Sequence, residues 1–392
     1  MDIKVVGIVG AGAMGSGIAQ VAVEAGHQVI LYDAFPKALE KSQASFEALM
    51  DKLIAKGKRT AEQKEQYLKN LHYEDQMNAL KNADLVIEAI VEDMDIKKKI
   101  FFDLEQITRE DTILASNTSS LPLSGIASAC EHPERVIGLH FFNPAPLMKL
   151  VEVIPAVQTR ADLPSLCMDL MKTWGKLPVK AKDTPAFIVN RVARPFYGEA
   201  LRVYEEGLAD MATIDWAMTE IGGFRMGPFT LMDFIGHDVN YSVTESVFKA
   251  FYYDPRYRPS FAQKSLVDAG WLGRKTGRGF FDYREGAQKP EPQKDRALGE
   301  MILWRILVML INEAADAYYW GIASRDDIDL AMTKGVNYPK GLLQWADEKG
   351  IPNVVETLDR LHSEYLEDRY RCSPLLRHMQ RNERTFYKQE EA

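Results

Sequence analysis

The chain has 392 residues, 46% of them apolar, and a formal net charge of -8 at pH 7. This length can bury about two or three hydrophobic cores, so we expect more than one domain. The acidic balance argues against a nucleic-acid partner, although it does not exclude a locally basic pocket for an anionic substrate. The longest apolar stretch, near residues 301–311, is interrupted by Arg305, so we expect no membrane span.

The three cysteines, Cys130, Cys167 and Cys372, are scattered along the chain without the spacing of a metal site. Thiols of this kind are typical of a reducing compartment. A strand-like run already begins at residue 3, which leaves no room for a signal peptide before it. The sequence therefore predicts a soluble, cytoplasmic protein that holds no metal.

The first element is a β-branched run over residues 3–9, followed at once by glycines in a G-x-G-x-x-G pattern and by helix formers over 13–25. In such a unit the first glycine allows the tight turn, the second lets the backbone approach a pyrophosphate, and the third allows close helix packing. The N-H groups at the start of the helix face the anion. The expected cofactor contacts in this turn are Gly10, Gly12, Ala13, Met14 and Gly15.

A second strand, over residues 28–32, ends beside Asp33, which lies 18 residues beyond Gly15. An acidic residue near this distance is typical of the carboxylate that binds the adenosine ribose hydroxyls. Because a carboxylate would repel a 2'-phosphate, we expect NAD rather than NADP. The alternative interpretation is a glycine-rich helix cap that binds no ligand.

A long, charged helical stretch follows over residues 36–71, with a break near Gly57. Lys52, Lys56, Lys58 and Arg59 cluster there. The simpler interpretation is a solvated face, and the alternative is a docking site for phosphates.

Strand-like runs alternate with helical runs through the first half of the chain, at residues 85–90, 112–115, 135–142 and 150–154. This alternation predicts a doubly wound, mainly parallel sheet with helices on both faces, the Rossmann-type α/β fold.

After Asp183 the pattern becomes helical, and Thr184 with Pro185 indicates the start of a helix. A polar segment rich in proline and glycine then interrupts the helical region. We therefore expect an NAD-binding domain over 1–183, a helical domain over 184–283, a linker over 284–295 and a second helical domain over 296–392.

The two helical parts are copies of one unit. Matching positions recur at a constant offset of 114 residues: Glu199-Ala200, Gly207, Ile214-Asp215, Ala217-Met218-Thr219, Gly227 and Asp233 reappear as Glu313-Ala314, Gly321, Ile328-Asp329, Ala331-Met332-Thr333, Gly341 and Asp347. This repeat predicts two helical units that face each other across a pseudo-two-fold axis. The second copy has Leu342 where the first has Pro228, and no nucleotide-binding pattern precedes it, so we interpret it as structural.

His140 lies near the carboxyl end of the predicted strand 135–142, and Glu152 lies in the next strand. Open parallel sheets bind ligands outside the carboxyl ends of their strands, so this histidine is expected to face the nicotinamide. Oxidation of an alcohol by hydride transfer needs a base, and the ordinary pKa of histidine suits that task. Glu152 is the candidate carboxylate that orients the ring. The alternative is a structural histidine.

Three further features favour a catalytic role for His140. Residues 115–120, ASNTSS, end a preceding strand with hydroxyl and amide groups. Asn190 lies early in the first helix of the helical region, where it is expected to reach back into a cleft between the domains. Glu92 follows another strand and supplies a carboxylate on the cofactor side.

The segments GAGAMGSGIAQ, EAIVED, SNTSSL, HFFNPAPLMKLVEV, DTPAFIVNR and GPFTLMDFIG occur in this order. In order and spacing they resemble the L-3-hydroxyacyl-CoA dehydrogenase family over residues 3–283, and the second helical copy resembles the duplicated C-terminal domain of longer members. The resemblance implies a reversible, NAD-dependent oxidation of an L-3-hydroxyacyl-CoA to a 3-oxoacyl-CoA, as in the β-oxidation of fatty acids.

The resemblance also implies roles for single residues. His140 matches the catalytic base, Glu152 the carboxylate that orients it, Ser119 the residue that bonds the substrate hydroxyl or the histidine, and Asn190 the residue that stabilises the thioester carbonyl. Asp33 matches the ribose acid. Further positions expected to contact NAD are Glu92, Lys97, Asn117, Ser119 and Asn143. The lysines within 36–71 fall where the family binds the CoA phosphates, without singling out one of them.

One position departs from the family pattern, which has glycine where this chain has Ala186. A helix that begins at Thr184 and Pro185 would give Ala186 an ordinary negative φ, so we expect full activity.

Short family members pair their helical domains between the subunits of a dimer. We therefore expect the second copy to supply that contact internally, giving a monomer with an internal pseudo-dimer; a homodimer is the alternative. Two other functions stay open: an NAD-dependent dehydrogenase of a free hydroxy or sugar acid such as L-gulonate, and a non-catalytic nucleotide-binding protein. The sequence leaves acyl-chain length, a second carboxylate on the acyl group and the physiological direction undetermined.

Overall fold

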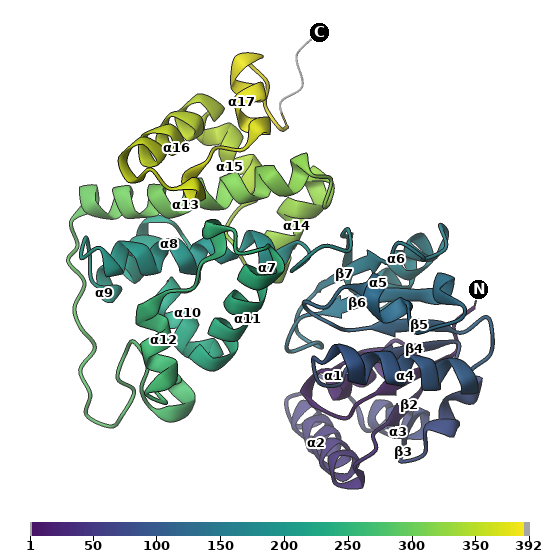
Figure 1. The fold of residues 1–392 in the computed structure, drawn as a ribbon. Helices are drawn as coiled ribbons and strands as arrows, with labels where there is room; N and C mark the ends of the chain where they lie inside the picture. Colours follow the sequence, from purple (N-terminus) through teal and green to yellow (C-terminus); the bar gives the residue numbers. More distant parts are fainter. Residues whose placement is uncertain (1, 388–392) are drawn as a thin grey trace. The chain divides into compact units, whose positions relative to one another are not determined.

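The computed structural model describes residues 2–387. The chain forms two compact units, Met1–Phe187 and Ile188–Ala392 (Figure 1). The first is a β-sheet flanked by helices, and the second is helical throughout its regular elements. Among the described residues, no helix is both long and apolar enough to cross a membrane.

The first unit contains an eight-stranded sheet in the order β3-β2-β1-β4-β5-β6-β7-β8. All neighbouring strands pair in parallel except β6 and β7, which are antiparallel. The mainly parallel sheet is therefore confirmed. The strands are β1 Val5–Val9, β2 Gln28–Tyr32, β3 Leu71–Glu74, β4 Leu85–Glu88, β5 Ile113–Ser116, β6 Val136–Phe141, β7 Leu150–Pro155 and β8 Leu177–Lys180.

The strand order reverses beside β1, because β2 and β3 lie on one side of it and β4 and β5 on the other. Right-handed crossovers then place the connecting helices of the two halves on opposite faces of the sheet. Both faces are covered, so strand residues on both sides are buried, with Val6 on one face and Val86 on the other. The helices of this unit are α1 Ala13–Glu24, α2 Pro36–Ala55, α3 Ala61–Asn70, α4 Met94–Ile107, α5 Leu123–Ala127 and α6 Leu163–Thr173.

In the second unit, the long helix α13 packs against α8 of the first copy and against α15, α16 and α17 of the second (Figure 1). Its apolar middle is buried on nearly all sides, which explains why its sequence is apolar without a clear stripe. The helices are α7 Val189–Val192, α8 Arg194–Glu205, α9 Met211–Trp216, α10 Pro228–Ile235, α11 His237–Ala250, α12 Phe261–Asp268, α13 Arg296–Tyr319, α14 Arg325–Gly335, α15 Leu342–Lys349, α16 Ile351–Tyr365 and α17 Pro374–Arg381.

The repeat seen in the sequence is also present in the atomic contacts. The carboxylate of Asp215 accepts from the backbone N-H groups of Phe229 and Thr230, and Asp329 does the same for Leu343 and Gln344. These donors again lie 114 residues apart. A Cβ on the glycine that precedes each helix, Gly227 or Gly341, would collide with its aspartate, so the repeat conserves glycine for space.

The two copies also exchange equivalent buried contacts. Arg191 of the first copy donates to Glu313 of the second at 2.6 Å, and Arg305 of the second donates to Glu199 of the first at 2.7 Å. Tyr257 and Tyr370 repeat this exchange, because their hydroxyls donate to Glu313 and to Glu199. Reciprocal contacts of this kind are what a two-fold relation produces, in agreement with the pseudo-dimer predicted from the repeat.

The backbone at Ala186 differs from the expectation. Ala186 has φ 64 and Phe187 has φ 49, so both lie in the left-handed region. The expected ordinary φ was wrong, and so was the helix start at Thr184, because the helix begins only at Val189. Both residues are about 1% exposed, so their packing holds a backbone conformation that non-glycine residues rarely adopt.

We expect Ala186→Gly to change the free energy of unfolding by less than about 0.5 kcal/mol, because relief of the positive φ offsets the lost methyl group and the added freedom of the unfolded chain. Ala22→Gly, at a buried position of α1 in the same unit, lacks that relief and is expected to cost about 1–2 kcal/mol. Urea unfolding of both variants tests this. Equal losses would show that Ala186 carries no backbone strain.

Burial by itself would raise the pKa of Glu313, but Arg191 and Arg256 lower it from 4.5 to about 2. A depressed folded-state pKa stabilises the protein fully above about pH 4.5, and that contribution is lost as the pH falls toward about 2. We expect Glu313→Gln to cost about 3–5 kcal/mol at neutral pH, because the arginines lose their shared anion. The difference from wild type is expected to shrink at about pH 3.

Urea unfolding of wild type and Glu313→Gln at the two pH values measures this difference. Glu300→Gln, at an exposed position of the same helix, is the control and is expected to stay within about 0.5 kcal/mol of wild type. A loss of the same size at both pH values would contradict the linkage.

Candidate functional site

The loops after β1, β4, β5 and β6 meet along one edge of the sheet, because these strands are parallel neighbours. Hydrogen bonds join each loop to the next. Ala89 N-H donates to the carbonyl of Val9 at 2.8 Å, and Asn117 N-H donates to the carbonyl of Glu88 at 2.8 Å. The side-chain oxygen of Asn117 then accepts from Phe141 N-H at 2.8 Å. Asn117 therefore ties the loop after β5 to the end of β6.

The glycine turn after β1 has the space that a dinucleotide requires. Gly10 has φ 104, and a Cβ there would lie 2.7 Å from the carbonyl of Ala89. A Cβ on Gly15 would lie 1.8 Å from the carbonyl of Gly10, so the helix approaches the turn too closely for any side chain. Gly12, in contrast, meets nothing within 4 Å and faces open space at the start of α1. This open position beside unpaired helix N-H groups fits a pyrophosphate.

Some of the other residues expected to contact the cofactor lie at this turn. Asp33 accepts from the N-H of Ala11 at 2.7 Å and from the N-H of Phe35 at 2.9 Å, so its carboxylate is held against the glycine turn. Ala13 is exposed and Met14 is half-buried in the first turn of α1. Asn143 is exposed after β6, before a cis peptide bond to Pro144.

His140 and Glu152 lie directly opposite each other in the antiparallel pair of β6 and β7. Their side chains therefore leave the sheet on the same face. His140 Nδ1 lies 2.6 Å from Glu152 Oε2, with the histidine 5% exposed and the glutamate fully buried. A carboxylate held against Nδ1 selects the tautomer with its proton on that nitrogen, and so leaves Nε2 as the basic nitrogen.

Aromatic rings fix the position of the imidazole. The ring of Phe142 lies 4.5 Å from that of His140, and the ring of Phe187 lies 5.9 Å from it. Neither phenylalanine was singled out in the sequence. The sequence could have indicated Phe142, because it directly follows the strand that carries His140.

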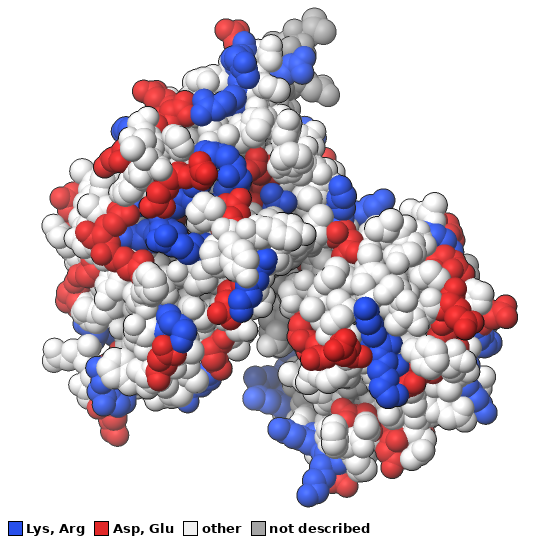
Figure 2. Space-filling view, in the orientation of Figure 1, with Lys and Arg blue, Asp and Glu red and all other residues white. Residues whose placement is uncertain are grey.

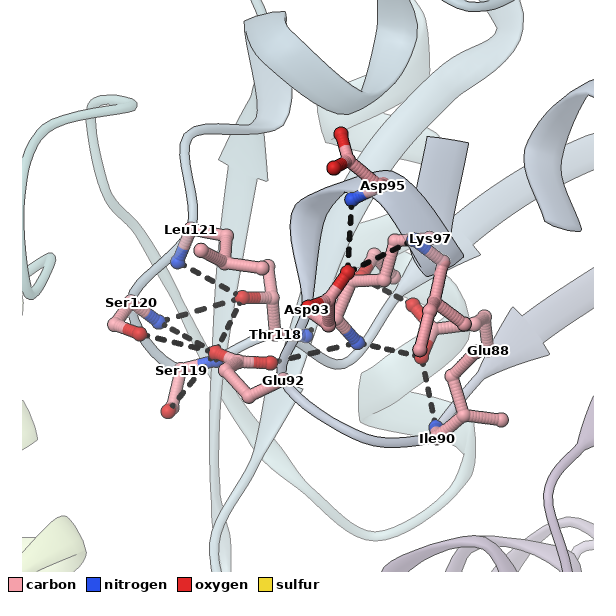
Figure 3. A network of polar contacts seen from close by, with 12 residues as sticks. Glu88, Ile90, Glu92, Asp93, Asp95, Lys97, Thr118, Ser119, Ser120 and Leu121 are labelled. Atoms are coloured by element: carbon pink, nitrogen blue, oxygen red, sulfur yellow. Dashed lines mark hydrogen bonds and ion pairs between the residues drawn. The ribbon is translucent and has the colours of Figure 1, made fainter. Parts of the chain in front are cut away.

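Glu92 holds the loop after β5 in place (Figure 3). One of its oxygens accepts from Thr118 Oγ1 at 2.6 Å, from the N-H and Oγ of Ser119 at 2.8 and 3.2 Å, and from Ser120. Burial would raise the pKa of Glu92, but the charge of Lys97 and these donors together lower it. The carboxylate therefore stays ionised and fixes Ser119 beside the end of the sheet.

Behind Glu92, Lys97 forms a buried ion pair with Glu88, which the sequence analysis did not single out. From the sequence, Lys97 was expected to contact NAD itself. Lys97 Nζ contacts Glu88 Oε1 at 2.6 Å and Glu92 Oε2 at 3.4 Å, while its side chain is only 1% exposed (Figure 3). Glu88 is fully buried at the end of β4 and also accepts from Ser116 and from the N-H of Ile90. The sequence contained a signal for this ion pair: a carboxylate at the end of a buried strand, followed by a lysine in the next helix.

Two other predicted features belong to other elements. Asn190 is in α7, at the start of the second unit, and its role stays a prediction. Lys37, Lys41 and Lys52 fall on one side of α2 at helical spacing, Lys56 directly follows the helix, and all four are exposed. Figure 2 shows basic side chains gathered over this helix at the lower edge of the first unit.

We expect Lys97→Met to cost about 3–5 kcal/mol of unfolding free energy, because it leaves the buried carboxyl group of Glu88 without its partner. Lys99→Met, on the same helix with a side chain 74% exposed, is the matched control and is expected to cost less than about 1 kcal/mol. Urea unfolding compares the two variants. Equal small losses would mean that the buried pair does not stabilise the loop network.

Two family models match the chain. The 3-hydroxyacyl-CoA dehydrogenase NAD binding domain matches residues 5–184, and the C-terminal domain of the same family matches twice, at residues 187–283 and 301–392. The double match agrees with the two helical copies.

Individual relatives agree with this family. The chain is 38% identical to the 3-hydroxyadipyl-CoA dehydrogenase of Escherichia coli (strain K12), over 96% of this chain and 97% of the relative. It is 42% identical to a probable 3-hydroxybutyryl-CoA dehydrogenase of Bacillus subtilis (strain 168), over 73% of this chain and 99% of the relative.

Among solved structures, the crystal structure of a 3-hydroxybutyryl-CoA dehydrogenase from Escherichia coli K12 matches with a TM-score of 0.91 and 37% identity, covering 96% of this chain and 98% of that one. These matches favour the acyl-CoA interpretation over the sugar-acid alternative. The chain belongs to the 3-hydroxyacyl-CoA dehydrogenase family, whose NAD-dependent members interconvert L-3-hydroxyacyl-CoA and 3-oxoacyl-CoA.

Proposed function

We propose that His140 is the base of this dehydrogenase and that Glu152 orients it. The observation that carries the proposal is the contact of 2.6 Å between His140 Nδ1 and Glu152 Oε2 at a buried position near the end of β6. His140 Nε2 takes the proton from the 3-hydroxyl of the substrate, and the carboxylate stabilises the imidazolium that forms. In the reverse direction the same nitrogen returns the proton.

NAD, when bound, accepts the hydride that leaves C3 of the substrate. Gly10, Gly12 and Gly15 give the turn that holds the pyrophosphate, with the exposed Ala13 and the half-buried Met14 at the start of the helix. Asp33 beside this turn binds the ribose and disfavours a 2'-phosphate. Glu92, Asn117 and Asn143 complete the cofactor side of the site.

Lys97 acts on this side of the site through its neighbours. Its ammonium group is buried and already paired with Glu88 and Glu92, so it holds the loop that carries Ser119. Ser119 presents its hydroxyl to the substrate oxygen, and Asn190 stabilises the thioester carbonyl and the charge that develops on it.

The substrate is an acyl-CoA thioester, and the exposed lysines of α2 are suited to its phosphates as mobile point charges. One relative is named for 3-hydroxyadipyl-CoA, which has a dicarboxylic acyl chain, and another for 3-hydroxybutyryl-CoA, which has a short monocarboxylic one. A dicarboxylic acyl group would place this protein in the degradation of dicarboxylic acyl chains, and a monocarboxylic one in β-oxidation. The three cysteines, all within the described residues, are free thiols, which fits a reducing cytoplasm. The second helical copy takes the place of a partner subunit within the chain.

We expect His140→Gln and Glu152→Gln each to lower kcat by about 10²–10⁴-fold, because the first removes the base and the second removes the charge that stabilises its protonated form. NAD affinity is expected to stay near that of wild type, because neither side chain belongs to the glycine turn. NADH absorbance with acetoacetyl-CoA measures turnover, and equilibrium titration measures NAD binding. Near-normal kcat in either variant would refute the assigned roles.

A further inference from the structure

One buried arginine in the second unit lacks the carboxylate partner that the other buried arginines have. Six arginines of the described residues are less than 9% exposed. Five of them form ion pairs with glutamate or aspartate: Arg135, Arg191, Arg256, Arg305 and Arg369. The sixth, Arg194, is 7% exposed, and no carboxylate within residues 2–387 pairs with it. A buried charge without a counterion is strongly disfavoured, so this exception calls for a ligand.

The contacts of Arg194 are all with uncharged groups. Its Nε donates to the backbone carbonyl of Asn190 at 3.0 Å, and Nη1 donates to Thr244 Oγ1 at 3.2 Å. The guanidinium also lies over the ring of Tyr197, 4.9 Å from its centre. These bonds use two of the five N-H groups of the guanidinium, whose planar fork is suited to a carboxylate. Burial lowers the pKa of Arg194, which reflects this uncompensated environment.

A second buried polar group lies beside Arg194. The hydroxyl of Tyr338 is buried and has no hydrogen-bond partner among the described residues. The ring of Tyr338 lies 5.7 Å from that of Phe196, which is two residues after Arg194, and Tyr338 interacts electrostatically with Arg194 and with Tyr197. Burial raises the pKa of Tyr338 well above its ordinary value, so the hydroxyl keeps its proton and can donate it in a hydrogen bond. A single carboxylate would satisfy both the guanidinium and this hydroxyl.

The position of Arg194 indicates where that carboxylate comes from. Its side chain folds back over the turn that carries Asn190, as the bond to the Asn190 carbonyl shows. Asn190 is the residue assigned above to the thioester carbonyl. The guanidinium therefore lies beside the residue that holds the thioester, so a carboxylate bound to it corresponds to the far end of a short acyl chain.

We infer that Arg194 and Tyr338 recognise the distal carboxylate of a dicarboxylic 3-hydroxyacyl-CoA. This inference rests on the proposed function, because it takes the acyl chain to extend from the thioester held by Asn190. It assigns Arg194 to substrate specificity rather than to the proton transfer carried by His140.

The test compares two substrates of equal chain length, 3-hydroxyadipyl-CoA and 3-hydroxyhexanoyl-CoA, which differ by the distal carboxylate. Wild type is expected to show a kcat/KM at least about 10-fold higher for 3-hydroxyadipyl-CoA. Arg194→Met is expected to lower that kcat/KM by about 10–100-fold, mainly through KM, and to leave 3-hydroxyhexanoyl-CoA unaffected. Tyr338→Phe, which keeps the ring, is expected to lower it by about 3–10-fold.

Arg202→Met is the matched control, because it removes the same charge from a half-buried position on α8. It is expected to leave both substrates unchanged. Equal kcat/KM for the two substrates in wild type would overturn the inference even if Arg194→Met does not fold. So would a loss of the same size on both substrates in Arg194→Met or Tyr338→Phe, since that indicates a structural role. Absence of NADH formation with either substrate in wild type would instead refute the proposed function.

Discussion

The antiparallel register between β6 and β7 is the constraint on which the candidate site depends. It places His140 opposite Glu152, so that a contact of 2.6 Å forms between residues 12 positions apart in the chain. A slip of one residue in this pairing would turn one of the two side chains to the other face of the sheet. Register is strongly specified here because both strands are buried along their length. The core packing of the sheet therefore sets the geometry of the proposed base.

Buried charge pairing links distant parts of each unit. Glu88, Lys97 and Glu92 connect the end of β4 to the loop after β5, and Arg191 with Glu313 spans 122 residues between the helical copies. Such pairs cost desolvation, and they persist only where hydrogen bonds satisfy each group. Because each of the other buried arginines has a carboxylate partner, the lack of a counterion at Arg194 carries information about a ligand rather than about the fold.

The helical repeat shows how a duplicated sequence builds an internal interface. Asp215 and Asp329 cap equivalent turns, and the arginines and glutamates of the two copies exchange partners across the pair. The exchange is incomplete, since Arg305 also bonds Glu206 and Arg256 also bonds Asp316. The two copies have therefore diverged in their outer contacts while they keep the reciprocal centre.

Local sequence determined the elements whose own residues decide their conformation: the glycine turn, strand β2, the break at Gly57 and the repeat. It also placed His140 near the end of one strand and Glu152 within the next. Strands β3 and β8 escaped prediction because they are short edge strands, and β8 contains Pro178, which lowers its strand signal. Only the tertiary structure decided the register of β7, the burial of Glu88 and the positive φ of Ala186. These features depend on packing between segments distant in sequence, which overrides what each segment prefers alone.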